Sequence, residues 1–241
     1  MTLKNKLKNY TKKTLAVKRG IGKRLKDNEA LSLMCYDEFL ANSSFDRIQK
    51  ILSKYELFRM TEKVPGDIVE CGVHKGSGIY LYAKFLKLFK PHSLTKIVGF
   101  DFFGKPQKVK NKYQLDYMCN IDHKGIGSTK NKIINNLKKF NINNVKLIAG
   151  DVCNTTKDYV KKNLGFRISM LILDVDNYEG TLECLKNLYP FVTKGGIIVF
   201  DEYALETYGE SDAVDEFLKN KKLKIKSIPW ASTPTAYTIK D

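Results

Sequence analysis

Acidic side chains stand at or just past the ends of five short apolar segments of this 241-residue chain. These acids are Glu70, Asp101, Asp151, Asp174 and Asp201. Carboxylates can hold a hydroxyl group, receive a proton or bind a hard cation such as Mg2+. A single acid after an apolar segment is most often a helix cap or a turn residue. Five in succession instead predict one site on which several carboxylates converge.

Such a site requires elements that present all five acids at one edge of the molecule. The apolar segments are short enough for strands, and segments with apolar residues at three- and four-residue steps alternate with them. This alternation predicts an α/β fold with a doubly wound, mostly parallel, Rossmann-like sheet. The carboxyl ends of parallel strands share one edge, so the acids should meet in a common crevice there.

The predicted elements divide the chain into three parts. Strands are predicted at 67–71, 96–100, 145–149, 169–173 and 197–200, with two more around 223–228 and 235–239. Helices are predicted at 29–63, 77–89, 129–140, 155–163 and 179–189, with another after residue 211. The parts are a basic arm (1–27), a helical extension (28–64) and the α/β domain (65–241), in which residues 102–128 are expected to form a lid.

A glycine-containing loop, GVHKGSG at residues 72–78, follows the first predicted strand. Its glycine spacing does not match the G-x-G-x-x-G pattern of dinucleotide sites, and its lysine, glycine and serine are in the wrong order for a P-loop. Glu70, two residues before Gly72, suits a ligand with a positive charge and an amino acid moiety, such as S-adenosylmethionine. An ordinary turn between a strand and a helix is the alternative. The loop residues expected around the cofactor are Gly72, Val73, Lys75, Gly76 and Ser77.

The later acids suggest separate roles. Asp101 follows the second predicted strand, where the acid of Rossmann-like folds accepts hydrogen bonds from both ribose hydroxyls. Asp151 suits the amino group of an adenine, with Val152 against the ring.

A denser acidic group follows the fourth and fifth predicted strands, and it consists of Asp174, Asp176, Asp201 and Glu202. Oxygen-only ligands of this kind suit Mg2+. Without a cation the four carboxylates would raise one another's pKa, so either a cation or a protonated member is expected.

Charge and cysteine usage narrow the class of protein. Residues 1–27 hold ten Lys and Arg against the single acid Asp27, and so carry +9 of the net charge of +16. Such an arm can bind nucleic acid, an anionic membrane surface or a charged partner, or it can be a solvated tail. No apolar run reaches the length of about 18 residues that a membrane span needs. No signal peptide is evident and the five cysteines are scattered, which predicts a cytoplasmic protein.

Over roughly residues 50 to 205 the chain resembles the TylF/MycF family. The shared motifs are Glu70-Cys71-Gly72-Val73-x-Lys75-Gly76, Val98-Gly99-Phe100-Asp101-x-Phe103, Leu173-Asp174-x-Asp176-x-Tyr178-Glu179, Leu188-Tyr189-Pro190, Gly195-Gly196 and Asp201-Glu202-Tyr203. The resemblance implies a class I S-adenosylmethionine-dependent O-methyltransferase that acts on sugar hydroxyls of macrolides and related glycosides. It implies cofactor binding at Glu70, Gly72, Asp101 and Asp151, and Mg2+ binding at Asp174, Asp201 and Glu202. The family usually has Asp-Asp where this chain has Asp201-Glu202, and the basic arm is not part of its pattern.

We therefore predict an enzyme that transfers a methyl group to a hydroxyl of a sugar or glycoconjugate precursor, assisted by Mg2+, with Asp174 or Asp176 receiving the proton. An RNA methyltransferase, favoured by the charge, and a non-catalytic binding protein with the same fold are the alternatives. We expect no specific nucleic-acid partner. A weak membrane-surface contact through the arm and a homo-oligomer are left open.

Overall fold

The computed structural model describes residues 17–18, 21–22, 27–103, 130–206 and 208–241. Residues 104–128 of the predicted lid and most of the basic arm therefore lie outside the described residues. Within the arm, β1 (Val17–Lys18) and β2 (Ile21–Gly22) pair antiparallel. The chain forms two compact units, Met1–Ile48 and Gln49–Asp241, and the second unit carries all the predicted site residues.

The helical segment predicted over residues 29–63 is confirmed, and Ser43 and Ser44 divide it into two helices. The structure has two helices, α2 (Asp27–Asn42) and α3 (Phe45–Met60), separated by Ser43 and Ser44. Asn and Ser side chains compete for backbone hydrogen bonds, which favours a helix end at this point. Asp46 in the first turn of α3 then suits a new helix start, because its negative charge lies at the positive end of the helix dipole.

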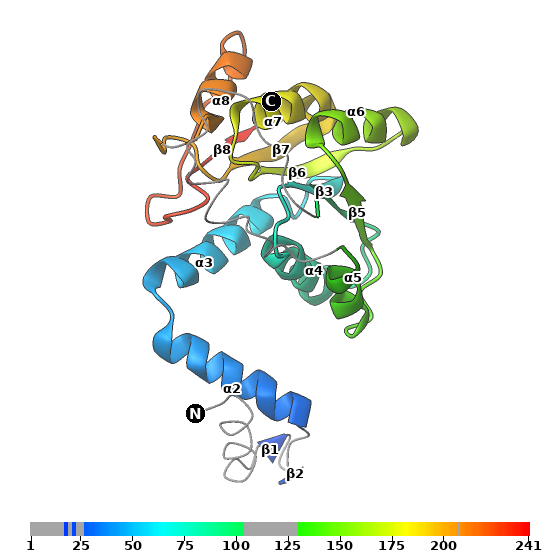
Figure 1. Cartoon of the computed structure of the whole chain (residues 1–241), viewed down its shortest axis with the longest axis vertical. Helices are drawn as coiled ribbons and strands as arrows, with labels where there is room; N and C mark the ends of the chain where they lie inside the picture. Colours follow the sequence, from blue (N-terminus) through cyan, green and yellow to red (C-terminus); the bar gives the residue numbers. More distant parts are fainter. Residues whose placement is uncertain (1–16, 19–20, 23–26, 104–129, 207) are drawn as a thin grey trace. The chain divides into compact units, whose positions relative to one another are not determined.

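The second unit is built on a six-stranded sheet with the order β5-β4-β3-β6-β7-β8 (Figure 1). The strands are β3 (Asp67–Cys71), β4 (Ile97–Asp101), β5 (Val145–Ala149), β6 (Ile168–Leu173), β7 (Val192–Phe200) and β8 (Ala236–Ile239). All pair in parallel except β8, which runs antiparallel to β7. The strand predicted around 223–228 is absent from this part of the chain, where only an isolated bridge joins Lys226 to Tyr237.

Helices cover both faces of this sheet (Figure 1). They are α4 (Ser77–Phe89), α5 (Lys130–Lys138), α6 (Val152–Lys162), α7 (Tyr178–Leu188), the short η2 (Tyr189–Phe191) and α8 (Glu210–Leu218). One core joins the sheet to α3, α4 and α5, and the other joins it to α6, α7 and α8. Neighbouring strand residues alternate between the two cores, as Ile68 and Val69 do. The structure thus confirms the doubly wound, mostly parallel sheet.

The carboxyl half of α3 belongs to the second unit. Leu57 and Phe58 are fully buried in the core beside α4, and the second compact unit begins within α3, at Gln49. This packing fixes one face of α3 against the sheet.

Within the described residues, no helix combines the length and the apolar character that crossing a membrane requires.

Candidate functional site

The five acids lie where the sequence places them, at the carboxyl ends of parallel strands. Glu70 is the penultimate residue of β3, and Asp101 is the last residue of β4. Asp151 precedes α6, while Asp174 and Asp201 directly follow β6 and β7. Strand order reverses between β3 and β6, and ligands of open parallel sheets bind at the carboxyl edge beside such a switch point.

At the switch point, the backbone of Gly72 is in close contact with the backbone of Asp174. Gly72 has φ +90°, and a Cβ at this residue would overlap the carbonyl oxygen of Asp174. The backbone N–H of Asp174 in turn donates to the carbonyl of Cys71 at 2.9 Å. The contact therefore ties the glycine loop to the loop that carries the later acids.

The glycines of the loop at residues 72–78 make room for neighbouring protein atoms. The space beside Gly72 is filled by backbone, and the space beside Gly78 is filled by the carboxylate of Glu70. Gly76, with φ +86°, precedes α4 and lies against the side chain of Ile133. In the described structure, protein atoms lie in the space beside each of these three glycines.

Glu70 is buried and faces a buried lysine of α3. Its side chain lies with Oε1 4.0 Å from Nζ of Lys54, and both side chains are at most 5% exposed. Burial raises the pKa of Glu70 to about 7, although the charge of Lys54 acts in the opposite direction. Burial alone would lower the pKa of Lys54, but the attraction of Glu70 and Asp201 outweighs it and the pKa is raised. Oε2 of Glu70 has no hydrogen-bond partner among the described residues.

Asp101 holds the glycine loop in place. Its Oδ2 accepts hydrogen bonds from the backbone N–H groups of Val73 and His74, both at 2.8 Å. Its Oδ1 accepts one from Phe103 at 2.7 Å. An ionised carboxylate offers about four acceptor positions, so room for a ribose hydroxyl is left. Asp101 therefore shapes the loop whether or not it also contacts a ligand.

The two residues predicted to bind adenine have structural roles. Asp151 caps α6, and its Oδ1 accepts from the backbone N–H of Cys153 at 2.9 Å. Val152 is buried in the core on the α6 side, which leaves little of it for an adenine ring. Of the predicted loop contacts, Lys75 and Ser77 are exposed, whereas Val73 is buried.

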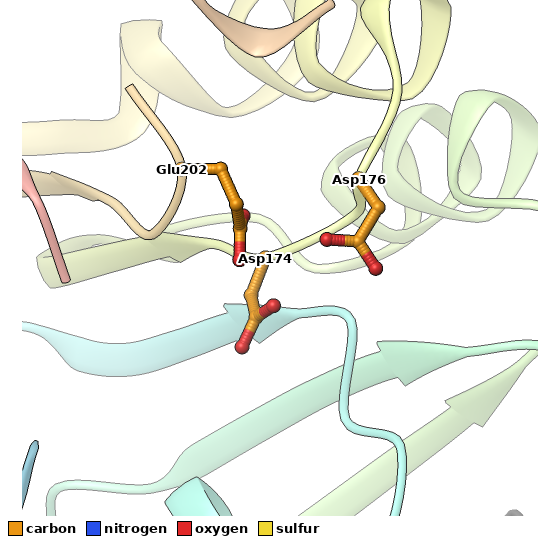
Figure 2. A group of neighbouring side chains, drawn as sticks. All are labelled: Asp174, Asp176 and Glu202. Carbon is orange, nitrogen blue, oxygen red and sulfur yellow. The ribbon is translucent and has the colours of Figure 1, made fainter. Parts of the chain in front are cut away.

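Three carboxylates lie close together beyond β6 and β7, and Figure 2 shows the loops that carry them. They belong to Asp174, Asp176 and Glu202, and one oxygen of each lies within 4.8 Å of the others. We call these residues the acid trio. Asp176 adopts the left-handed backbone conformation, with φ +60°, in the turn between β6 and α7. Burial and then the charge of Asp201 and Asp176 raise the pKa of Asp174, and burial with Asp174 and Asp201 raises that of Glu202.

Asp201 lies outside the acid trio, which differs from the predicted ligand set of Asp174, Asp201 and Glu202. Its carboxylate is only 1% exposed, and Oδ2 accepts a hydrogen bond from Nζ of Lys50 at 2.9 Å. Asp176 belongs to the trio, and the predicted binding of a cation by Asp174, Asp201 and Glu202 stays a prediction. Glu202, the departure from the family pattern, does join the trio, and its Oε2 is buried with no partner in the described part of the chain.

Sequence reasoning missed three residues that support the site, namely Lys50, Lys54 and Glu210. Glu210 is fully buried in the first turn of α8, and its Oε1 accepts from the backbone N–H of Glu202 at 3.0 Å. Burial raises its pKa well above the usual value. Lys50 and Lys54 precede the buried Phe58 at steps of four residues, so helical spacing could have revealed that both lie on the packed face.

A shallow hollow lies at the opposite, amino edge of the sheet, lined in part by Asp67, Lys96 and Arg167. None of the predicted site residues lines it. The hollow is therefore separate from the site formed by the acids.

The sheet order and the glycine loop after β3, with acids at the carboxyl edge, define a Rossmann-like methyltransferase fold of class I. Residues 42–233 match the sequence model of the macrocin-O-methyltransferase (TylF) family, so the chain belongs to this family and the predicted resemblance is confirmed.

Two relatives and one solved structure illustrate the similarity. The 8-demethyl-8-(2,3-dimethoxy-alpha-L-rhamnosyl)-tetracenomycin-C 4'-O-methyltransferase of Streptomyces olivaceus is 25% identical, over 65% of this chain and 64% of its own. The demethyldecarbamoylnovobiocin O-methyltransferase of Streptomyces niveus is 28% identical, over 64% of this chain and 58% of its own. The apo structure of the TDP-rhamnose 3'-O-methyltransferase of calicheamicin biosynthesis is 25% identical, with a TM-score of 0.66, over 85% of this chain and 86% of that chain. The matches thus span less than two thirds of the two curated relatives' lengths.

Proposed function

We propose that this protein is an S-adenosylmethionine-dependent O-methyltransferase that methylates a hydroxyl of a sugar or glycoconjugate precursor, assisted by a divalent cation. The observation that carries the proposal is the acid trio, which adjoins the glycine loop through the contact between Gly72 and Asp174. Family membership and the names of the relatives, one of which acts on a rhamnosyl group, support the same reaction.

The residues of the glycine-loop side fit the proposed cofactor. Oε2 of Glu70 is a buried acceptor without a partner among the described residues, and Asp101 keeps acceptor capacity beyond its three backbone bonds. In this proposal Glu70, Gly72 and Asp101 hold the cofactor, which supplies an electrophilic methyl group when bound. Val73, Lys75, Gly76 and Ser77 complete the loop around it, and Asp151 lies at the next strand end.

The acid trio fits a hard divalent cation. Three carboxylates in close reach provide the oxygen ligands that Mg2+ prefers, and the buried Oε2 of Glu202, which has no hydrogen-bond partner among the described residues, is one of the oxygens a cation could contact. A bound cation would supply Lewis acidity, which lowers the pKa of an acceptor hydroxyl.

The chain itself would orient the acceptor and take up its proton. Methyl transfer is an in-line displacement, so its rate depends mainly on alignment of the hydroxyl with the methyl donor. The backbone contact at Gly72 sets the spacing between the cofactor side and the trio. Asp174 and Asp176, both on the loop after β6, are the carboxylates that we propose as proton acceptors.

The alternatives predict different behaviour. An RNA methyltransferase should bind RNA with an affinity that falls steeply with salt and should methylate a selected RNA, whereas we expect only weak binding that is lost on deletion of residues 1–27. A binding protein should hold S-adenosylhomocysteine without transferring methyl groups to any acceptor.

The deciding experiment measures methyl transfer from S-adenosylmethionine to rhamnose-containing acceptors, together with calorimetry of S-adenosylhomocysteine. Asp174→Ala should abolish transfer and leave S-adenosylhomocysteine binding nearly unchanged, because Asp174 lies on the trio side of the site. EDTA should act like this substitution. Asp158→Ala, an exposed change on α6, is the matched control and should have no effect. Binding of NAD in place of S-adenosylhomocysteine, or transfer by Asp174→Ala at the wild-type rate, would overturn the proposal.

A further inference from the structure

Three loops at the amino edge of the sheet, opposite the acids, carry a concentration of positive charge. Segments 87–96, 138–146 and 161–167 each run from the last turn of a helix to a strand, namely β4, β5 and β6. We call these segments the amino-edge loops. Together they hold nine Lys and Arg, three in each, and no Asp or Glu. This charge is separate from that of the basic arm.

Helix ends explain only part of this charge. Cations are favoured in the last turn of a helix, where the helix dipole is negative. Four of the nine lie in such turns, namely Lys87, Lys138, Lys161 and Lys162. The other five lie beyond the helix ends, and they are Lys90, Lys96, Lys139, Lys146 and Arg167. The excess therefore needs a reason other than helix stability.

Each amino-edge loop also exposes a large apolar side chain. Leu94 is 93% exposed, Leu164 is 94% exposed and Phe140 is 59% exposed. A single exposed apolar residue is ordinary on a protein surface. Here the loops lead to strands of the consecutive set β5-β4-β3-β6, so the three side chains lie along one edge. Positive charge and exposed apolar side chains are thus combined on one surface.

Hydrogen bonds join the amino-edge loops to one another. The backbone N–H of Lys96 donates to Oδ1 of Asp67 at 2.8 Å, and the N–H of Asp67 donates to the carbonyl of Arg167 at 2.8 Å. Nδ2 of Asn144 donates to the carbonyl of Thr95 at 2.9 Å. All three loops are therefore connected through the start of β3, and their side chains are presented on a common, preorganised surface.

We propose that the amino-edge loops dock the protein on an anionic lipid membrane. The lysines and Arg167 supply attraction to the negatively charged headgroups, while Leu94, Leu164 and Phe140 enter the apolar boundary of the bilayer. The hollow of about 610 Å3 lined by Lys96, Arg167 and Leu164 offers space for a headgroup. Docking in this way leaves the acids at the carboxyl edge turned away from the membrane. The inference goes beyond the proposed function and does not depend on it.

The surface fits a lipid membrane better than it fits a nucleic acid or a second copy of the chain. Single-stranded nucleic acids stack their bases on aromatic side chains, whereas the two most exposed apolar residues here, Leu94 and Leu164, have no ring. A symmetric contact between two copies would place the amino-edge loops of one against those of the other. Nine cations would then face nine cations without acids to offset them.

The test is cosedimentation of the purified full-length protein with lipid vesicles. We expect binding to vesicles of phosphatidylcholine and phosphatidylglycerol in equal parts, and none to phosphatidylcholine alone. Leu94→Ser/Leu164→Ser removes apolar contacts, and Lys96→Gln/Lys162→Gln removes two charges. Each double variant should weaken binding about tenfold or more. Both should keep the melting temperature and the S-adenosylhomocysteine affinity of the wild type, because none of the four side chains is buried.

Two matched variants serve as controls. Ile51→Ser/Leu52→Ser changes exposed apolar residues of α3, and Lys130→Gln/Lys157→Gln removes two exposed charges from α5 and α6. All four residues lie outside the amino-edge loops, so both variants should bind anionic vesicles like the wild type.

A fluorescent probe reports which part of the protein enters the lipid. Trp230 is the only tryptophan of the chain, so Trp230→Phe provides a background without tryptophan emission. In this background, Leu164→Trp should shift its emission to the blue when anionic vesicles are added. Lys157→Trp, at an exposed position in the middle of α6, should not shift.

Four results would overturn the inference, and none of them bears on methyl transfer to a soluble acceptor. The first is a wild type that does not bind anionic vesicles. The second is vesicle binding that both double variants retain in full, which would place the attachment elsewhere, as in the basic arm. The third is RNA binding that Lys96→Gln/Lys162→Gln loses, without vesicle binding by the wild type. The fourth is a smaller oligomer in Leu94→Ser/Leu164→Ser by analytical ultracentrifugation, again without vesicle binding, which would make the surface an interface between copies.

Discussion

The carboxylate of Glu70 occupies the space that a side chain at position 78 would need. Glu70 comes from β3 and Gly78 from the first turn of α4, so the two elements meet with a carboxylate between them. Any side chain at position 78 would have to move a buried acid that already lies beside Lys54. The last glycine of the loop therefore positions Glu70 at the proposed cofactor site.

Gly78→Ala should weaken S-adenosylhomocysteine binding by displacing the carboxylate of Glu70. Alanine normally stabilises a helix interior by about 1 kcal/mol relative to glycine, so a loss of affinity or stability here would run against helix propensity. Calorimetry and the melting temperature measure the two effects. Lys87→Ala, an exposed substitution in the same helix, is the control. Unchanged affinity in Gly78→Ala would show that Glu70 can move without consequence.

Asp101→Ala should weaken S-adenosylhomocysteine binding by roughly 1.5–3 kcal/mol, the range for hydrogen bonds to a charged group. The substitution removes the acceptor of three backbone N–H groups as well as any contact with a ribose. Adenine alone, which carries no ribose, separates the two roles when its binding is measured by calorimetry. If Asp101 acts by holding the loop, adenine binding should fall too. A loss confined to the ribose-containing ligand would instead indicate direct contact.

Stability should fall with rising pH because of Glu70. Its pKa is raised from 4.5 to about 7 by burial, partly opposed by Lys54 and Lys50, with Asp201 and Asp101 acting in the same direction as burial. Below pH 4.5 the Glu70 carboxyl is protonated in both the folded and the unfolded chain. Its contribution to the free energy of unfolding has its full value there. Between pH 4.5 and about 7 only the unfolded chain loses the proton, so the contribution disappears across this window.

The matching variant is Glu70→Gln, which cannot ionise. The free energy of unfolding of the wild type, relative to this variant, should fall by about 3 kcal/mol between pH 4.5 and pH 7.5. Urea unfolding at several pH values provides the measurement. A difference that does not vary with pH would mean that Glu70 stays ionised in the folded protein, with Lys54 as its effective partner.

The sheet was predictable from sequence because most residues of its strands are apolar and must be buried. Mainly apolar strands such as Ile168–Leu173, which is buried along its whole length, fit only between two layers of helices, and the turns and acids after them mark where they end. The boundary between α2 and α3 is marked by Ser43 and Ser44, whose side chains favour a helix end or a helix start.

The site was predictable in its location but not in its pairing. That acids meet at the carboxyl edge follows from strand direction alone. Which acid pairs with which cation depends on the position of α3, because Lys50 approaches Asp201 from 151 residues away in the chain. Asp176, which has a left-handed backbone conformation, lies in the acid trio, while the assignment of Asp174, Asp201 and Glu202 as metal ligands stays a prediction.

Glu210 provides the last prediction, because it supports the acid trio without belonging to it. Its Oε1 accepts from the backbone N–H of Glu202 at 3.0 Å, and the side chain is fully buried at the start of α8. Glu210→Ala leaves this N–H without its acceptor and opens a cavity, so it should destabilise the protein by about 1–3 kcal/mol and reduce methyl transfer. Glu210→Gln retains an acceptor oxygen and the shape of the side chain. It should preserve most of the stability and most of the methyl-transfer activity. Urea unfolding and the transfer assay distinguish the two variants. If Glu210→Gln lost transfer as fully as Glu210→Ala while keeping its stability, the carboxyl group itself would have a part in the reaction, and a purely positioning role for Glu210 would be wrong.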